Sequence, residues 1–263
     1  YIENVDTPRL VEWERWRRRR RIKSSELTSN RLKKEYTTIF SILKYGVELG
    51  FIQTLCMKPT TLSKQLTSTK RTPSRTTFTW KEYKKLLSVS RKRISESKKK
   101  FELQKKLKKQ KGKKSFGGGW ENIYKQRRYL HYFIILLSNT GVRPGELLRV
   151  KHKDIKIKKS RKQTNCHLEI SVKGKKSDRT VISKYGGYFG YLSLIENICP
   201  DFDDDDLLFP YSPRNSMKEL LEECGLRYSS NGDRRDSKSL RHFYIMTSIV
   251  NGISTDVLTV QCD

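Results

Sequence analysis

Two arginines with charged neighbours could act together on a phosphodiester. Glu146 follows Arg143 by three residues, and Lys238 precedes Arg241 by three. Residues at this spacing share one helix face, so a carboxylate can orient one guanidinium and a rigid helix can hold the other. Two converging guanidinium groups can donate to both non-bridging oxygens of a phosphate and stabilise the added charge of a five-coordinate transition state. The pattern indicates phosphoryl transfer.

A lysine between these two segments could supply the proton that such a reaction needs. Lys173 lies where a β-hairpin is predicted to turn, and a flexible ammonium there could protonate a leaving 5′-oxygen. Taken singly, these residues are better explained as a surface ion pair, a turn lysine and a helix charge. The order and spacing of the three segments together favour the catalytic interpretation.

The elements that would position Arg143 are predicted to be helical. The run Tyr129 to Leu137 is nearly all apolar and too short to span a membrane, so it predicts a buried helix ending at Thr140 and Gly141. A short helix is predicted at 144–150. Arg143 would therefore lie at a turn between two helices.

A small sheet and further helices are predicted for the rest of the second half. Alternating apolar residues predict a hairpin with arms at 167–172 and 179–183. Helices are predicted at 217–224 and 238–251, with a polar loop at 225–235 between them. This half is therefore predicted to be mainly helical with a small antiparallel sheet.

The first part of the chain is predicted to be helical as well. Apolar residues recur at helical spacing from Asn30, and Gly50 is a typical stop for that helix. An earlier helix is predicted at 11–23, with Trp13 and Trp16 in the core. These two helices would form a small unit of their own.

Consecutive arginines follow the two tryptophans, and one face of that helix could contact phosphates. The candidate DNA-binding side chains are Arg17, Arg18, Arg20 and Arg21. A charged helix face in contact with water explains the run equally well. The sequence alone leaves both explanations open.

Composition divides the chain into two domains. Residues 56–76 are rich in Thr, Ser, Lys and Pro and lack periodicity, which is typical of a linker. We predict a helical domain at 1–56, a linker at 57–76 and a larger domain at 77–263. A basic insert at 91–128 holds 16 of the 57 basic residues and three acidic ones. It is predicted to be an arm or a mobile extended helix that closes on DNA or contacts only solvent.

The overall charge narrows the class of partner. Lys and Arg number 57 against 28 Asp and Glu, so the formal charge is +29. Such a field attracts polyanions through counterion release, and nucleic acid is the leading partner. On charge alone, a basic ribosomal or membrane-surface protein is the alternative. No apolar run approaches ~20 residues and the start is not a signal peptide, so a soluble intracellular protein without membrane contact is expected.

No metal site is predicted. The five cysteines are scattered without a CxxC pair, and none of the four histidines lies at zinc-ligand spacing from them. Residues 201–206 read DFDDDD but lack the glycine and terminal glutamate of a calcium loop. A solvated turn is the better explanation, and the cysteines are expected to be reduced and structural.

Two of the three segments match known motifs. Residues 140–146 have the pattern T-G-x-R-x-x-E after a predicted buried helix, and residues 238–242 read K-x-x-R-H. Both patterns resemble those of the tyrosine recombinases, a family that includes phage integrases, bacterial chromosome-dimer resolvases and integrases of mobile elements. The resemblance covers nearly the whole chain, although the basic insert departs from the usual pattern.

The hairpin matches the family less closely. A catalytic lysine of the family lies in a stretch like K-x-K-x-x-R-x-V, which Lys173, Lys175 and Arg179 resemble with one residue extra. Lys173 is the predicted general acid and Lys175 its alternative, while Lys175 and Arg179 are also candidate DNA contacts. The resemblance implies a catalytic set of Arg143, Lys173, Lys238 and Arg241, with Glu146 in support.

The resemblance also implies a fold and an activity. The fold would be α+β, mainly α, with a small helical core-binding domain and a mixed catalytic domain that together clamp duplex DNA. The activity would be site-specific recombination or integration, with DNA cut and rejoined through a 3′-phosphotyrosine and no metal or nucleotide cofactor. A homotetramer on the DNA is expected, in the cytoplasm and associated with the nucleoid.

The family's nucleophilic tyrosine is expected beyond the printed sequence. By the resemblance, a His or Trp should follow shortly after Leu258 and the tyrosine after that, so we expect a fragment that does not cleave DNA. Tyr244, which follows Arg241, is expected to be packed within its helix. The alternatives are a non-catalytic, recombinase-derived DNA-binding accessory protein and an enzyme like the type IB topoisomerases.

Overall fold

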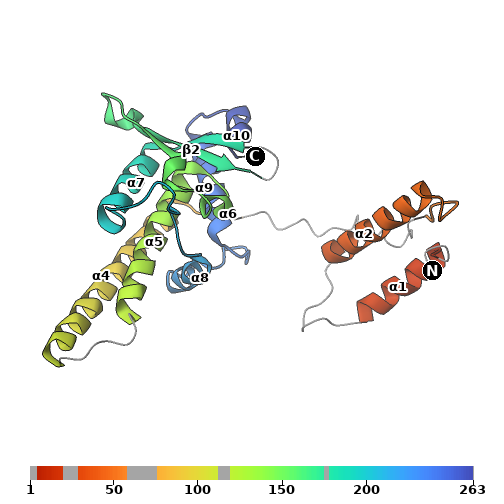
Figure 1. Cartoon of the computed structure of the whole chain (residues 1–263), viewed down its shortest axis with the longest axis horizontal. Helices are drawn as coiled ribbons and strands as arrows, with labels where there is room; N and C mark the ends of the chain where they lie inside the picture. Colours follow the sequence, from red (N-terminus) through yellow and green to blue (C-terminus); the bar gives the residue numbers. More distant parts are fainter. Residues whose placement is uncertain (1–4, 20–28, 58–75, 112–118, 175–177, 263) are drawn as a thin grey trace. The chain divides into compact units, whose positions relative to one another are not determined.

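The polypeptide folds into two units that divide within the predicted linker, residues 1–73 and residues 74–263. Both are drawn in Figure 1. The computed structural model describes residues 5–19, 29–57, 76–111, 119–174 and 178–262.

The first unit pairs helix α1 (Thr7–Arg19) with helix α2 (Ser29–Glu48). Gly50 takes a φ of +76° just after α2 ends, a left-handed conformation that stops a helix, as predicted. The buried apolar side chains between the helices are Leu10, Leu32, Tyr36 and Phe40. The unit therefore has a small core of its own.

The two tryptophans of α1 differ in burial. Trp13 meets the ring of Tyr36 edge-on, with ring centroids 5.2 Å apart. Trp16 is 47% exposed, so its predicted place in the core is wrong. The buried stripe of α1 includes Leu10 and Arg17 instead. Adjacent residues of a helix point about 100° apart, so position 16 falls beside the stripe.

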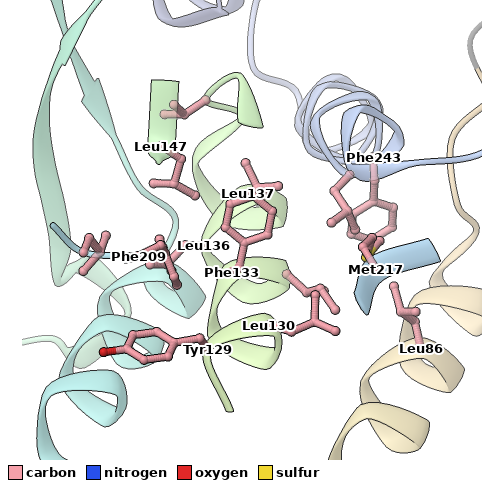
Figure 2. Packing of buried hydrophobic residues seen from close by; sticks show 14 of the residues in the cluster. Leu86, Tyr129, Leu130, Phe133, Leu136, Leu137, Leu147, Phe209, Met217 and Phe243 are labelled. Carbon is pink, nitrogen blue, oxygen red and sulfur yellow. The ribbon is translucent and has the colours of Figure 1, made fainter. Parts of the chain in front are cut away.

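Helix α5 (Gly119–Thr140) is central to the second unit and contains the predicted buried run. It lies against three other helices, α4 (Trp80–Lys111), α7 (Tyr185–Ile198) and α9 (Ser237–Val250). Phe133 and Leu137 of α5 lie between Leu86 of α4 and Leu147, and Phe243 of α9 joins the same cluster (Figure 2). All of these side chains are at least 97% buried.

A three-stranded antiparallel sheet packs beside these helices. The order is β1 (Ile155–Lys158), β2 (His167–Lys173) and β3 (Asp178–Ile182). The predicted hairpin is confirmed as β2 and β3, with Val172 opposite Arg179. Strand β1 was not predicted, because four residues of IKIK are too short for a clear alternation.

Three shorter helices complete the second unit: α6 (Pro144–Leu147), α8 (Arg214–Glu223) and α10 (Thr255–Cys262). Helix α6 ends earlier than the predicted 144–150, and α8 corresponds to the predicted 217–224. Helix α10 lies against α9 and β3, where it covers Tyr244. Of these short helices, α6 and α10 contribute contacts to the arginines predicted to act on phosphate.

The described part of the basic insert is a helical arm. The second half of α4 and the first turns of α5 run side by side away from the sheet (Figure 1). Phe101 stacks on Tyr124 with ring centroids 6.1 Å apart, and the Lys100 ammonium lies 4.5 Å from the ring centre of Trp120. The extended helix predicted for this insert is therefore present in the described residues.

Candidate phosphate-binding site

Arg143 lies at the turn that joins α5 to α6. Gly141 ends α5 with a φ of +67°, and Arg143 precedes Pro144, the first residue of α6. Proline is favoured there because its fixed φ suits a helix start and its missing N–H is not needed. The Arg143 side chain is 44% exposed and so remains accessible to a ligand.

Glu146 reaches back across the first turn of α6 to Arg143, as predicted. Its Oε1 accepts a hydrogen bond from Nη1 of Arg143 at 2.9 Å, and its Oε2 lies 3.3 Å from the Arg143 backbone N–H. Only 3% of the Glu146 side chain is exposed. A buried carboxylate therefore fixes the direction of the arginine fork.

The same carboxylate binds a second guanidinium from the sheet. Nη2 of Arg179 donates to Oε2 of Glu146 at 2.7 Å. Burial alone would raise the pKa of Glu146, but the hydrogen bonds and charges of Arg179 and Arg143 outweigh it and hold that pKa below its ordinary value. Arg179 was predicted to contact DNA, and the structure places its side chain, 10% exposed, in this internal pair.

Arg241 reaches the same turn from α9. Its Nη1 donates to the carbonyl oxygen of Gly141 at 2.9 Å. Burial, together with the nearby charges of Arg143 and Arg179, lowers the pKa of Arg241 from its ordinary value. An arginine in a protein remains protonated even so. Arg241 is thus hydrogen-bonded to the turn that carries Arg143, and the two predicted clamp arginines lie close enough for their charges to interact.

The cluster carries an excess of positive charge. Three guanidinium groups, of Arg143, Arg179 and Arg241, neighbour one another, and Glu146 supplies the carboxylate that pairs with two of them. Such an imbalance in a half-buried place favours an anion with several acceptor oxygens. A phosphodiester is an anion of that kind.

Helix α10 closes one side of the cluster, which the sequence did not predict. The carbonyl oxygen of Gln261 accepts a hydrogen bond from Nε of Arg179 at 3.1 Å. Cys262 is buried with its Sγ 3.8 Å from the Gly141 carbonyl oxygen, and burial raises the pKa of its thiol. These contacts leave Arg179 with neighbours on both sides and add no further charge.

Lys173 lies beside this cluster in the strand register. It is exposed at the end of β2 and pairs with Asp178, one position beyond the pairing of Val172 with Arg179. Lys175, the alternative general acid, lies outside the described residues. Lys173 has no contact with the arginines among the interactions of the described residues, so its role stays a prediction.

Lys238 lies in the first turn of α9, on the same face as Arg241. Its backbone N–H is capped by Oδ1 of Asp236 at 2.7 Å, and its side chain is exposed. The carboxylate of Asp236 stabilises the start of the helix that holds Arg241. Lys238 therefore lies about one turn before Arg241 on α9, and its part in the site stays a prediction.

The arginine run of the first unit has internal partners. Nε and Nη2 of Arg17 donate to the two carboxylate oxygens of Glu35 at 2.8 and 2.7 Å, and 9% of the Arg17 side chain is exposed. Arg18 binds Glu14 at 2.7 Å. Arg20 and Arg21 lie outside the described residues. The fork of Arg17 thus joins α1 to α2, and DNA contact by this run stays a prediction.

The aspartate-rich segment contacts lysines. Oδ1 of Asp205 accepts from Nζ of Lys151 at 2.7 Å and from Nζ of Lys153 at 2.6 Å, which lowers the pKa of Asp205 to about 2. Within the described ranges, no group of three or more His, Cys, Asp or Glu could hold a metal ion. Among those same residues, no helix is both long and apolar enough to cross a bilayer.

Comparisons with solved structures show that the fold is a known one. No family model matches the chain, and the search of curated proteins found no match. The XerH site-specific recombinase bound to palindromic difH substrate, a post-cleavage complex, is similar with a TM-score of 0.62 and 16% identity over 99% of this chain and 64% of that one. The XerH pre-cleavage complex with difH substrate gives 0.58 and 17%, over 98% and 64%.

A transposon protein is similar to the same degree. The Tn1549 transposon integrase in complex with transposon right end DNA gives a TM-score of 0.59 and 13% identity over 100% of this chain and 78% of that one. The chain thus has the fold of the tyrosine recombinases, mainly α with a small antiparallel sheet. It spans 64% of the length of the XerH chains.

Proposed function

We propose that the chain is part of a site-specific DNA recombinase or integrase, which cuts and rejoins duplex DNA through a 3′-phosphotyrosine. The observation that carries the proposal is the meeting of Arg143 and Arg241 at the turn after α5, beside a third arginine and one carboxylate. The tyrosine recombinase fold supports it, and the neighbours in that fold are bound to DNA substrates.

In this proposal each side chain of the cluster has a role. Arg143 and Arg241 donate to the non-bridging oxygens of the scissile phosphate and stabilise the charge that develops on them. Glu146 and Arg179 hold Arg143 in place as positioning residues. Lys173, or Lys175 as its alternative, protonates the leaving 5′-oxygen. Lys238 contributes positive charge from the first turn of α9, and the reaction uses no metal or nucleotide.

The nucleophile is proposed to come from a segment outside the printed sequence. The chain alone would then bind duplex DNA without cleaving it, and the complete protein would act as a homotetramer at a recombination site. Tyr244 is 2% exposed, and its hydroxyl donates to Oε1 of Gln261 at 2.8 Å. A phenol held in this way is a poor candidate for in-line attack.

A non-catalytic DNA-binding accessory protein is the second candidate function. The burial of Tyr244 favours it as much as it favours a separately supplied nucleophile. The two candidates differ in one outcome, because only the recombinase would form a covalent link to DNA once a tyrosine segment is present. Both predict DNA binding by the chain itself.

Binding to duplex DNA in the absence of magnesium tests both candidates. The affinity should fall steeply between 50 and 200 mM salt, since a protein that neutralises several phosphates releases their counterions. Fluorescence anisotropy with a labelled duplex measures this slope. An affinity that does not depend on salt concentration, or a preference for single-stranded RNA, would contradict the proposal.

A further inference from the structure

Helix α4 carries basic pairs at regular spacing. They lie at positions 84–85, 91–92, 98–99 and 105–106, so each pair follows the last by seven residues. All of these side chains are exposed. We call this set the outer stripe; it consists of Lys84, Lys85, Arg91, Lys92, Lys98, Lys99, Lys105 and Lys106.

The buried residues of α4 repeat with a matching period on the opposite face. The residues of this face are Tyr83, Leu86, Ser90, Arg93 and Ser97, spaced alternately by three and four. Seven residues make nearly two turns of a helix, so both sets stay in line along the axis. Burial of one face therefore holds the outer stripe towards solvent.

Contacts with α5 and α8 hold the arm that carries the stripe. Besides the stack of Phe101 on Tyr124, Nη1 of Arg127 on α5 donates to the Arg93 carbonyl oxygen at 2.8 Å. Arg93 also lies 3.3 Å from a carboxylate oxygen of Glu223 on α8. Binding of a ligand to the stripe would therefore cost little conformational entropy in the backbone of the arm.

The charge of the stripe is weakly compensated within the described residues. The ion pairs of its members are Lys92 with Glu96 at 4.0 Å and Lys98 with Glu102 at 3.9 Å. Exposed pairs of this kind contribute little to stability. Residues 91–111 hold 11 basic and two acidic residues. Their mutual repulsion falls when a polyanion lies alongside.

We infer that the outer stripe is a second DNA-binding surface, which contacts the phosphate backbone of duplex DNA outside the arginine clamp without reading its sequence. The inference rests on the proposed DNA-binding function. It adds the surface along which the duplex continues beyond the arginine clamp. Lys84 to Lys106 spans ~33 Å of helix, the length of about ten base pairs. Lysine suits this contact, because a flexible point charge binds phosphate without fixing a base.

The start of the stripe lies near the clamp. Trp80 and Tyr83 of α4 both contact the ring of Phe243, with centroids 5.1 and 4.6 Å apart, and Phe243 follows Arg241 by two residues on α9. The stripe then runs outward along the arm. A duplex held by Arg241 could thus continue along α4.

A neutral stripe tests the inference in the full chain. The test variant combines Arg91→Gln with Lys→Gln at 92, 98, 99, 105 and 106, because glutamine keeps the helix propensity. Binding of a 40-base-pair duplex should weaken at least ~10-fold at 0.1 M salt, with the slope of log affinity against log salt smaller by about 3 to 5. The hydroxyl-radical footprint should shorten at one end by up to about ten base pairs.

Two control variants separate position from net charge. Arginine at the same five lysine positions should keep the footprint and the slope, since it preserves charge. Glutamine at six lysines elsewhere in the unit, 153, 156, 158, 159, 162 and 218, lowers the net charge equally and should leave the footprint length unchanged. Circular dichroism verifies that each variant keeps its helix content.

The possible failures are distinguishable. If the unmodified chain does not bind duplex DNA, the proposed function fails. If it binds but the neutral stripe gives the same footprint and slope, the inference is overturned while the function stands. Stripe-dependent binding of polyglutamate as tight as that of the duplex would also overturn it, because the occupant would then be an acidic protein surface.

Discussion

Arg179 on β3 donates from Nη2 to Oε2 of Glu146 on α6 at 2.7 Å, although 33 positions separate the two residues. The side chains are 10% and 3% exposed. This pair fastens the edge of the sheet to the turn that presents Arg143. Its loss should therefore weaken the fold and release the clamp arginine together.

Replacing Glu146 with glutamine should lower the free energy of unfolding by about 3 kcal/mol at pH 7, because removing one partner leaves a buried charge uncompensated. Urea denaturation followed by circular dichroism measures the change. Glu196→Gln on the exposed side of α7 is the matched control and should be nearly neutral. Equal stability of the Glu146→Gln variant and the unmodified chain would contradict the role of the pair.

The effect of Glu146→Gln should depend on pH. The pKa of Glu146 is held below its ordinary value of 4.5, so the stability that it contributes is present above that pH. It is lost as the pH falls through the lower pKa of the folded state. The difference between variant and unmodified chain should therefore shrink below pH 4.5. A difference that stayed constant there would exclude this linkage.

The clamp arginines should affect cleavage more than binding. In a longer chain that includes a tyrosine segment, Arg143→Ala or Arg241→Ala should reduce covalent adduct formation by ~100-fold or more, since each removes a donor to the transition state. Adducts on a nicked site-containing duplex are counted on denaturing gels. Affinity for the same duplex, measured in parallel, should change little. Normal cleavage by either variant would remove that arginine from the site.

The local part of this site was predictable from sequence. Glu146 reaches Arg143 because both lie in one helical turn, and a three-residue spacing fixes that contact almost regardless of the rest of the fold. The buried helix before the turn was equally predictable, because α5 reads as an apolar run ending at Thr140 and Gly141. Spacing along one element therefore carried these predictions.

Contacts between distant elements were not predictable. Arg179 was interpreted as a DNA contact because a hairpin arginine gives no sign of which carboxylate lies opposite. Helix α7 was missed for a related reason. Its residues Gly186, Gly187 and Gly190 disfavour a helix in isolation, yet a Cβ at Gly190 would lie 2.6 Å from Ile135 of α5. Tertiary packing requires these glycines, and local propensity cannot reveal it.

Lys173 should matter only when the leaving group needs a proton. In the longer chain, Lys173→Ala should slow cleavage of an ordinary phosphodiester by roughly 100-fold or more and spare a substrate with a 5′-thiolate leaving group. Single-turnover kinetics on the two substrates measure the difference. If Lys175→Ala shows this pattern and Lys173→Ala does not, the hairpin alignment is wrong and the alternative general acid is correct.

Lys184 should make stability depend on pH in the alkaline range. Its Nζ donates to Oγ1 of Thr247 at 2.9 Å and lies 4.6 Å from the ring centre of Tyr244. Burial lowers the pKa of Lys184 to about 8, from an ordinary 10.5. Between these values the unfolded chain binds more protons than the folded one, so this group raises the free energy of unfolding as the pH rises from 8 to 10.5.

The variant Lys184→Met tests that linkage. Relative to the unmodified chain, Lys184→Met should be most stable at pH 7. This advantage should shrink towards pH 10, because the unmodified chain loses its buried lysine charge over that range and methionine has no charge to lose. Urea denaturation at several pH values gives the comparison. Lys218→Met on the exposed face of α8 is the control and should show no such trend. A pH-independent difference for Lys184→Met would contradict the prediction.

Residues 1–263 should not form a covalent link to DNA by themselves. An attacking phenol must approach the phosphate in line, opposite the leaving oxygen, from a segment that can move over the arginines. Of the 13 tyrosines, Tyr244 follows Arg241 and the others precede it. Tyr244 is buried and its hydroxyl donates a hydrogen bond to Oε1 of Gln261. Burial raises the pKa of Tyr244 to about 12. A phenol in this state is neither free to move nor easily deprotonated.

We therefore expect the chain to bind a nicked, site-containing duplex without forming a covalent adduct. Adding a C-terminal extension with a His or Trp followed by a Tyr should create adduct formation, and changing that added tyrosine to phenylalanine should remove it. Denaturing gels with a labelled strand detect the adduct, and anisotropy on the same duplex verifies binding. An adduct formed by residues 1–263 alone and abolished by Tyr244→Phe would show that the nucleophile lies in α9, and the proposed separate tyrosine segment would then be wrong.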